Sequence, residues 1–133
     1  MHLLLIRVYG IIYKIVISDP KEKGERKKLN FGHTFGHAIE SYCLQKGTPI
    51  LHGEAIFMGM ILESELSSLS DSDKNEIKNY ILSNFGLPYT PPKSDLLYFL
   101  RNDKKNKEEK INFSLLKGIG KCTINNFFLE DEL

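Results

Sequence analysis

Hydrophobic residues change their spacing along the chain, and each spacing predicts a different kind of element. Between about residues 26 and 46 they recur near the 3.6-residue period of a helix, at Leu29, Phe35, Ala38, Ile39 and Tyr42. Gly47 and Pro49 follow and stop the pattern. We therefore expect a first helix that begins near Arg26 and ends before Gly47.

A second helix is predicted to begin near His52 and to run to about residue 69, because hydrophobic residues continue through this stretch at helical spacing. Glu54 falls in its first turn, where the positive end of the helix dipole favours a carboxylate. A break at "SDSD" follows this helix.

Two further helices are predicted in the middle of the chain. One covers residues 72–85, with Ser72 or Asp73 as its N-cap. A Pro-rich link then leads to a short helix within residues 90–103, for which Ser94 is the expected cap. With the first two helices, these would form a helical body.

The two ends of the chain differ from this helical middle. Residues 2–17 mix β-branched residues with Leu and Tyr, and this composition is compatible with either a strand or a helix. Residues 110–116 and 122–128 favour strands, and the "KGIGK" between them is typical of a hairpin turn. The predicted fold is mainly α, with a small β-hairpin near the C-terminus.

Length and charge limit the class of protein. A chain of 133 residues with 41% hydrophobic residues can form one compact domain with a real core. Its 18 Lys and Arg against 17 Asp and Glu leave a formal net charge of +1, which gives no long-range field for DNA or an anionic membrane. We therefore expect no nucleic acid and no membrane as partners, and any anion site must be local.

Cysteine usage and the opening segment bear on the cellular compartment. Cys43 and Cys122 lie far apart without CxxC spacing, which argues against a disulfide framework and against a zinc ribbon. Arg7 and Lys14 interrupt the apolar opening, and no signal-peptide cleavage site follows it. We expect a soluble protein in a reducing cytoplasm.

A polar stripe occupies one face of the first predicted helix. Its members follow one another at intervals of four, three, four and three residues: Arg26, Asn30, His33, His37 and Glu40. A face turned to water usually carries Lys, Glu and Gln rather than a guanidinium, an amide and two imidazoles. The stripe therefore indicates hydrogen-bond donors and ligands.

The paired histidines His33 and His37 leave three interpretations open. Imidazoles four residues apart on a helix can share a metal, with His52 as the nearest third ligand and Glu54 and Cys43 as weaker candidates. They can take part in acid–base chemistry. They can also be ordinary hydrogen-bonded residues in a tight helix contact, since a glycine precedes each of them.

Four blocks resemble, in order, the carboxy-terminal half of 3-dehydroquinate synthase: "DPKEKGERKKLNFGHTFGHAIE", "LHGEAIFMGM", "FGLP" and "RNDKKNKEEKINFSLLKGIG". The resemblance implies a helical metal- and substrate-binding domain over residues 15–133, preceded by an uncertain segment over residues 1–14. In the family this domain follows a Rossmann-like half that binds NAD. No Gly-rich phosphate loop after a strand occurs in these 133 residues.

The resemblance also implies an activity. Enzymes of this family are lyases that convert 3-deoxy-arabino-heptulosonate 7-phosphate to 3-dehydroquinate and phosphate, in the shikimate pathway to chorismate and the aromatic amino acids. They use NAD and a divalent metal, zinc or cobalt, and the full enzymes form homodimers. We expect the chain to be a fragment that is inactive alone. The alternatives are another sugar-phosphate cyclase of the superfamily and a non-catalytic remnant.

Position by position, the resemblance implies roles for residues of the stripe. His33 and His52 match metal ligands. His37 matches a substrate-site residue, which would hydrogen-bond the substrate or an ordered water. Arg26 and Asn30 would hold carboxylate, phosphate or hydroxyl groups of a small sugar-acid phosphate.

Three positions of the match are less regular. A family lysine that reaches the substrate matches Lys104 or Lys105, and the match does not choose between them. Another substrate-binding lysine of the family aligns with Ile12, and Lys14 could replace it only after a shift. The third family metal ligand is a glutamate on a segment before this chain begins. We therefore expect His33 and His52 alone to hold a metal weakly.

Overall fold

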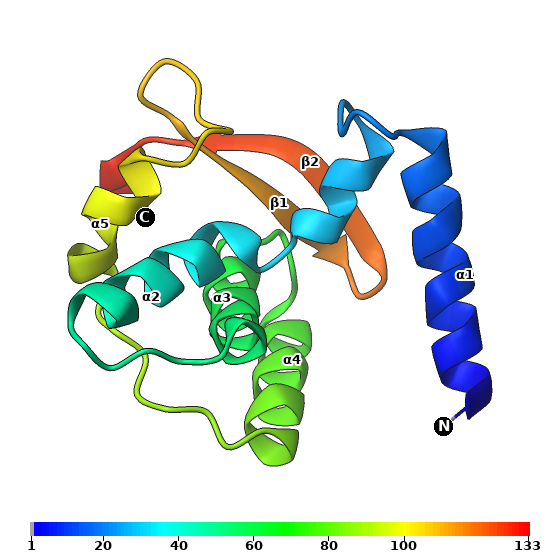
Figure 1. The fold of residues 1–133 in the computed structure, drawn as a ribbon, viewed down its shortest axis with the longest axis horizontal. Coiled ribbons are helices and arrows are strands. Elements are labelled where there is room, and N and C mark those ends of the chain that lie inside the picture. The colour runs from blue at the N-terminus through cyan, green and yellow to red at the C-terminus, as the bar shows by residue number, and fades with distance from the viewer. Residues whose placement is uncertain (1) are drawn as a thin grey trace.

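The computed structural model describes residues 2–133, with side chains from Gly10 onward. Figure 1 shows a helical body, a two-stranded hairpin beside it and one helix that stands apart. The longer helices are α1 (His2–Ser18), α2 (His33–Gln45), α3 (His52–Leu66), α4 (Asp71–Asn84) and α5 (Lys93–Arg101). The other elements are the 3₁₀ helices η1 (Glu25–Asn30) and η2 (Glu130–Glu132) and the strands β1 (Ile111–Gly118) and β2 (Lys121–Phe128). The mainly α fold with a C-terminal hairpin is confirmed.

The helical body forms around α2, which packs against α3 on one side and α5 on the other, while α4 packs on α3. The buried core lies where α2, α3, α5 and β1 meet, and its largest apolar members are Phe35, Ile39, Met58, Leu96, Leu100, Ile111 and Phe113. Cys43 is also part of this core, and neither it nor Cys122 forms a disulfide. The core therefore holds the first turns of α2, which carry two of the histidines, against α3.

Three glycines bring α2 and α3 unusually close. Gly32 precedes α2 with φ 86°, a left-handed conformation that favours glycine. A Cβ at Gly36 would lie 2.7 Å from the Ile56 side chain, and one at Gly59 would collide with the Gly32 carbonyl oxygen. The backbones of the two helices are therefore in direct contact.

The hairpin packs its first strand into the body. β1 and β2 are antiparallel, with Gly118 opposite Lys121 across the turn. The pairing register shifts at Ser114 and again at Lys117. The first five residues of β1 are all buried, whereas β2 is mostly half-buried or exposed. β1 thus forms part of the core and β2 covers it.

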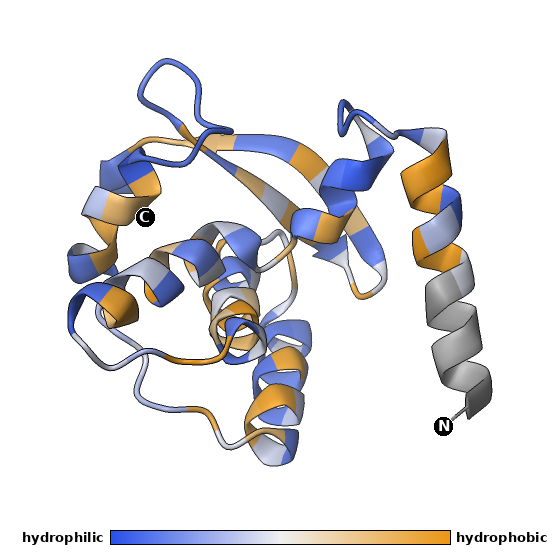
Figure 2. Ribbon diagram, in the orientation of Figure 1, coloured by the Kyte–Doolittle hydropathy of each residue, from blue (hydrophilic) through white to orange (hydrophobic). Residues whose placement is uncertain are grey.

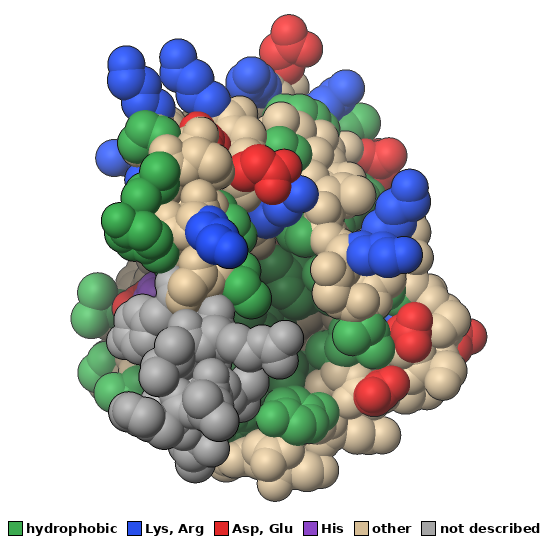
Figure 3. Space-filling model, turned by 90° about the vertical axis from the view of Figure 1, so that its right-hand side faces the viewer, with side chains coloured by type: hydrophobic (Ala, Val, Ile, Leu, Met, Phe, Trp, Pro, Cys, Tyr) green, Lys and Arg blue, Asp and Glu red, His purple; other side chains and the backbone are tan. Residues whose placement is uncertain are grey.

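The helix α1 lies at the edge of the molecule and approaches η1 (Figure 1). The side chains of Ile11, Tyr13 and Ile17 are 59%, 66% and 59% exposed. Figure 2 marks hydrophobic positions on this helix, and Figure 3 shows hydrophobic side chains exposed on the face that α1 occupies. Residues 2–17, which were compatible with strand or helix, are helical; Met1 lies outside the described residues.

The first predicted helix is wrong as one continuous element. Its opening part is the 3₁₀ helix η1, and the chain then turns at Phe31, with ψ 127°, and Gly32 before α2 begins. A residue with extended ψ followed by one with positive φ cannot continue a helix. The stripe from Arg26 to Glu40 is consequently divided between two elements.

Two predicted caps are also wrong. Ser70, rather than Ser72 or Asp73, caps α4, because its side chain accepts a hydrogen bond from the Asp73 amide at 3.1 Å. The helix α5 begins after Pro92 without a side-chain cap, and Ser94 lies inside it. Pro92 is itself the N-cap, with ψ 145°, so the helix begins at Lys93 and Ser94 comes too late to cap it.

None of the helices in the described part of the chain is both long and apolar enough to cross a bilayer. The division of the chain into residues 1–14 and 15–133 stays a prediction, and α1 runs through that boundary as a single helix.

Candidate functional site

Three imidazoles meet at the start of α2 and α3. His33 and His37 lie one turn apart on α2, and His52 is the first residue of α3. The ring centroid of His33 is 5.5 Å from that of His37 and 5.9 Å from that of His52, and the His37 and His52 centroids are also 5.9 Å apart. The structure therefore brings together the three histidines that the sequence singled out.

Two of these imidazoles are oriented through their Nδ1 atoms. His33 Nδ1 lies 3.3 Å from the Phe31 carbonyl oxygen, and His52 Nδ1 lies 2.9 Å from a carboxylate oxygen of Glu40. An acceptor at Nδ1 selects the tautomer that carries its proton there and leaves the Nε2 lone pair free. Carbonyl and carboxylate partners of this kind are typical of metal-ligating histidines.

The surroundings favour neutral imidazoles on α2. Burial is the main cause that lowers the pKa of His33, and the nearby His37, His52 and Lys105 lower it further. Burial also lowers the pKa of His37, with a contribution from Lys105, while Asp103 and Glu40 oppose the shift. A neutral imidazole is the form that binds a metal or accepts a proton.

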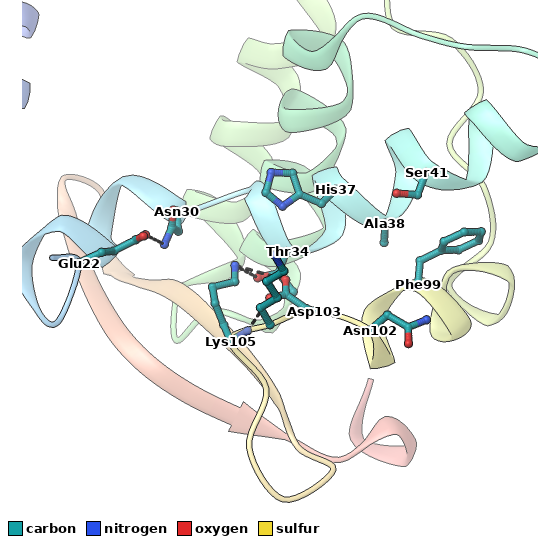
Figure 4. Close-up of a pocket in the computed structure, with 11 residues that line it drawn as sticks. Glu22, Asn30, Thr34, His37, Ala38, Ser41, Phe99, Asn102, Asp103 and Lys105 are labelled. Carbon is teal, nitrogen blue, oxygen red and sulfur yellow. Dashed lines mark hydrogen bonds and ion pairs between the residues drawn. The ribbon is translucent and has the colours of Figure 1, made fainter.

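A cavity of about 450 Å³ opens beside His37. Its walls come from η1, from the first half of α2, and from the end of α5 with the loop that follows (Figure 4). Its polar lining includes Glu22, Asn30, Thr34, His37, Asp103 and Lys105. The cavity lining holds an imidazole, two ammonium groups, two amides and two carboxylates, and each carboxylate already has a partner: Asp103 pairs with Lys105, and Glu22 accepts from Asn30.

Lys105 is the lysine whose ammonium group is held inside the cavity wall. Its Nζ donates to the Thr34 hydroxyl at 3.1 Å and pairs with an Asp103 carboxylate oxygen at 3.4 Å (Figure 4). Lys104 also lines the cavity, but its side chain is exposed. The loop between α5 and β1, which Figure 2 shows to be hydrophilic, thus contributes an oriented cation at Lys105.

The two polar residues from η1 lie in different places. Asn30 lines the cavity and donates to a Glu22 carboxylate oxygen at 2.6 Å. Arg26 donates from Nη1 to the Pro20 carbonyl oxygen at 3.0 Å and is not among the cavity-lining residues. Of the two predicted anion partners, the structure places Asn30 beside His37 and Lys105.

Sequence reasoning missed Glu22, Thr34 and Asp103. Glu22 lies in the charged turn before η1, where an exposed carboxylate is the ordinary expectation, and only its positive φ of 55° makes it unusual. Asp103 directly precedes Lys104 and Lys105 in the sequence. An ion pair between Asp103 and one of these lysines could therefore have been predicted. Thr34 has no such signal, because its hydroxyl bonds to β1 at Asn112, far along the chain.

The weaker metal candidates have structural roles. Glu54 lies in the first turn of α3, as predicted, and it also accepts a hydrogen bond from the Leu51 amide at 3.0 Å. Cys43 is buried in the core, and burial raises the pKa of its thiol. Ile12 and Lys14 lie on α1, outside the cavity lining.

The donor set fits part of a divalent metal site. Among the described residues, no group of three His, Cys, Asp or Glu side chains is placed to hold a metal. His33 and His52, however, each offer a free Nε2 beside an Nδ1 anchored on oxygen. These residues thus fit as two ligands of a metal that takes at least one more from elsewhere.

Comparison with known proteins decides the family. Residues 4–106 match the family described as "3-dehydroquinate synthase C-terminal". The chain belongs to this family. The 3-dehydroquinate synthase of Prochlorococcus marinus strain MIT 9303 is 42% identical over 127 residues, and that of Parabacteroides distasonis is 40% identical over 126 residues. Each match covers 90% of this chain but only 33% and 36% of the relative, so the chain spans about a third of the length of these synthases.

One solved structure is similar to this chain in fold. It is a 2-deoxy-scyllo-inosose synthase in complex with carbaglucose-6-phosphate, NAD⁺ and Co²⁺. It has a TM-score of 0.62 and 30% sequence identity, and the match covers 79% of this chain and 31% of that one. That neighbour binds a sugar phosphate analogue, a nicotinamide cofactor and a divalent metal, as its description states.

Proposed function

We propose that this chain supplies metal- and substrate-binding residues of a 3-dehydroquinate synthase. The observation that carries the proposal is the convergence of His33, His37 and His52 beside a cavity that also holds the Lys105 ammonium group. Family membership supports the reaction: conversion of 3-deoxy-arabino-heptulosonate 7-phosphate to 3-dehydroquinate and phosphate, in the shikimate pathway. The protein would work in the cytoplasm, as part of a homodimeric enzyme.

In this proposal His33 and His52 hold a divalent zinc or cobalt ion through Nε2. When bound, such an ion supplies Lewis acidity and a template for oxygen atoms of the substrate. The Glu40 carboxylate keeps the His52 ring turned so that Nε2 is free, and the Phe31 carbonyl does the same for His33. NAD would be bound by residues other than those of this chain.

The cavity residues would bind and orient the sugar-acid phosphate. Lys105 presents an ammonium group for an oxyanion, and the Asn30 amide can bond to a hydroxyl or phosphate oxygen. Burial lowers the pKa of His37, which favours the neutral imidazole that can accept a proton from a substrate hydroxyl or from water. Arg26 would join these groups only after its side chain leaves the Pro20 carbonyl.

We expect the chain to bind Co²⁺ weakly, and His33→Ala and His52→Ala should each weaken the affinity by at least about tenfold. Loss of a residue that only orients a metal ligand already has an effect of this size, so loss of a ligand itself should have at least as large an effect. The reason is that each variant removes one of only two protein ligands. Visible absorption during Co²⁺ titration, with calorimetry for Zn²⁺, would measure the effect.

The matched controls for this titration are the other two of the four histidines. His2→Ala and His37→Ala should leave the metal affinity nearly unchanged. Equal affinities for the unmodified chain and His33→Ala would contradict the ligand assignment, and a loss on His37→Ala equal to that of His33→Ala would contradict the separation of the two roles.

We expect no phosphate release when the chain alone is incubated with 3-deoxy-arabino-heptulosonate 7-phosphate, NAD and Co²⁺. The physical reason is that the family reaction needs a bound NAD, and the sequence has no Gly-rich phosphate loop after a strand. A full-length synthase under the same conditions is the positive control. If the chain released phosphate faster than the reaction without protein, and Lys105→Met abolished this release, the chain would be active alone.

A second candidate is another sugar-phosphate cyclase, because the 2-deoxy-scyllo-inosose synthase shares the fold and 30% of aligned residues. The 3-dehydroquinate synthases are closer in sequence, at 40–42% identity. A third candidate is a non-catalytic remnant that retains the helices and some metal affinity. Competition between 3-deoxy-arabino-heptulosonate 7-phosphate and carbaglucose-6-phosphate for binding to the chain would separate the two cyclase assignments.

A further inference from the structure

Glu63 is a fully buried carboxylate that the proposed reaction does not use. It lies on α3, one turn after Gly59, and its side chain has 0% exposure. Within the described residues neither of its oxygens has a hydrogen-bond partner of ordinary geometry. A buried charge or polar group without partners is costly, so its presence requires an explanation.

Glu63 lies on the face of α3 that meets the start of α2, because it follows by one turn Gly59, where an added Cβ would collide with the Gly32 carbonyl oxygen. Burial raises the pKa of Glu63 well above its ordinary value, whereas the amides of Thr34, Gly32 and Phe35 act in the opposite direction. The N-cap of α2 is Gly32, which has no side chain to accept these amides, and no other side chain caps the helix. The first turn of α2 therefore has N–H donors without a side-chain cap, and the pKa of the buried Glu63 carboxyl group responds to these amides.

Lys105 influences the same carboxyl group. Its ammonium charge also lowers the pKa of Glu63, second only to the opposing effect of burial. Lys105 Nζ is bonded to Thr34 in the first turn of α2, and Thr34 in turn donates to the Asn112 carbonyl oxygen of β1 at 3.1 Å. Glu63 thus lies opposite both the helix that carries two histidines and the lysine that lines the cavity.

We propose that Glu63 is a positioning residue for the candidate site: from α3 its buried carboxyl group caps the first turn of α2, the turn to which Lys105 is bonded through Thr34. In this role it holds Lys105 and the histidines of α2 in their mutual arrangement. Its connection to catalysis rests on the function proposed above, while its capping role does not.

The test compares Glu63→Gln with Glu65→Gln by amide hydrogen exchange. Both replace a carboxylate on α3 by an amide of the same shape, but Glu65 is exposed and pairs with Lys93 at 3.3 Å. Glu63→Gln should speed exchange at Thr34 and Phe35 roughly fivefold relative to Ile39 in the middle of α2, an effect of the size that loss of a cap produces. Glu65→Gln should leave this ratio of exchange rates unchanged. If Glu63→Gln also left it unchanged, Glu63 would have only a packing role.

A second readout uses the unmodified chain and therefore does not depend on the variant folding. The amide proton shifts of Thr34 and Phe35 should titrate together with the Glu63 carboxyl group, and this common titration should vanish in Glu63→Gln. Amide shifts that do not follow Glu63 would overturn the inference.

The link to the site is measured by Co²⁺ affinity, which should weaken roughly fivefold in Glu63→Gln and not in Glu65→Gln. Unchanged Co²⁺ affinity in Glu63→Gln would overturn the positioning role. If the unmodified chain binds no Co²⁺, the proposed metal function fails, and the exchange and shift measurements still decide whether Glu63 caps α2.

Discussion

Replacing Gly59 by alanine should lower the free energy of unfolding by roughly 3 kcal/mol, the upper range for overpacking a close contact. A methyl group at this position would collide with the Gly32 carbonyl oxygen and would lie 2.6 Å from the Gly36 amide nitrogen. Both obstacles are backbone atoms, so no side chain can rotate to make room. The variant can fold only if α2 and α3 move apart.

Urea unfolding followed by circular dichroism would measure this effect, with Gly53→Ala as the matched control. Gly53 lies on the same helix, and a Cβ there would meet nothing within 4 Å. We expect the control to be neutral or more stable by up to about 1 kcal/mol, because alanine has the higher helix propensity. If Gly59→Ala were as stable as Gly53→Ala, the two helices would not be in backbone contact.

Replacing Phe113 by alanine should cost about 3–5 kcal/mol of stability, as large cavities in a core do. Phe113 is 1% exposed on β1, and its ring centroid lies 5.4 Å from that of Phe35 on α2 and 5.6 Å from that of Phe128 on β2. The ring therefore joins the hairpin to the helix that carries the histidines. Since whole domains are stable by about 5–15 kcal/mol, this loss would leave a large unfolded population.

The matched control is Phe127→Ala, on the same hairpin. Phe127 is 36% exposed, so the loss should stay at about 1–2 kcal/mol. Thermal and urea unfolding of both variants would test the contrast. Equal losses at Phe113 and Phe127 would mean that the hairpin is not anchored through the Phe35 contact.

Several elements were predictable from local sequence. The helices α3, α4 and α5 and the hairpin appear where hydrophobic spacing and turn residues placed them. These signals are local, because a helix period or a "KGIGK" turn is legible within a few residues. The two histidines of α2 and the one at the start of α3 were identifiable for the same reason, and their family roles stay proposals.

Other features depended on contacts between distant segments. The break at Phe31 and Gly32 was not expected, because hydrophobic spacing continues across it. Lys105 could not be distinguished from Lys104 by sequence, since the choice follows from the Thr34 hydroxyl on another element. Glu63 was not noticed, because a glutamate on an amphipathic helix ordinarily faces water.

The sequence by itself determined the helical class, the hairpin and the residue types of the site, since these follow from local periodicity and from the family motif. Only the tertiary structure decided which groups meet. The glycine contact between α2 and α3 brings His52 to His33 and His37, and the loop after α5 brings Lys105 to Thr34. The physical reason is that burial and long-range backbone contact, unlike helix period, depend on all packed elements at once.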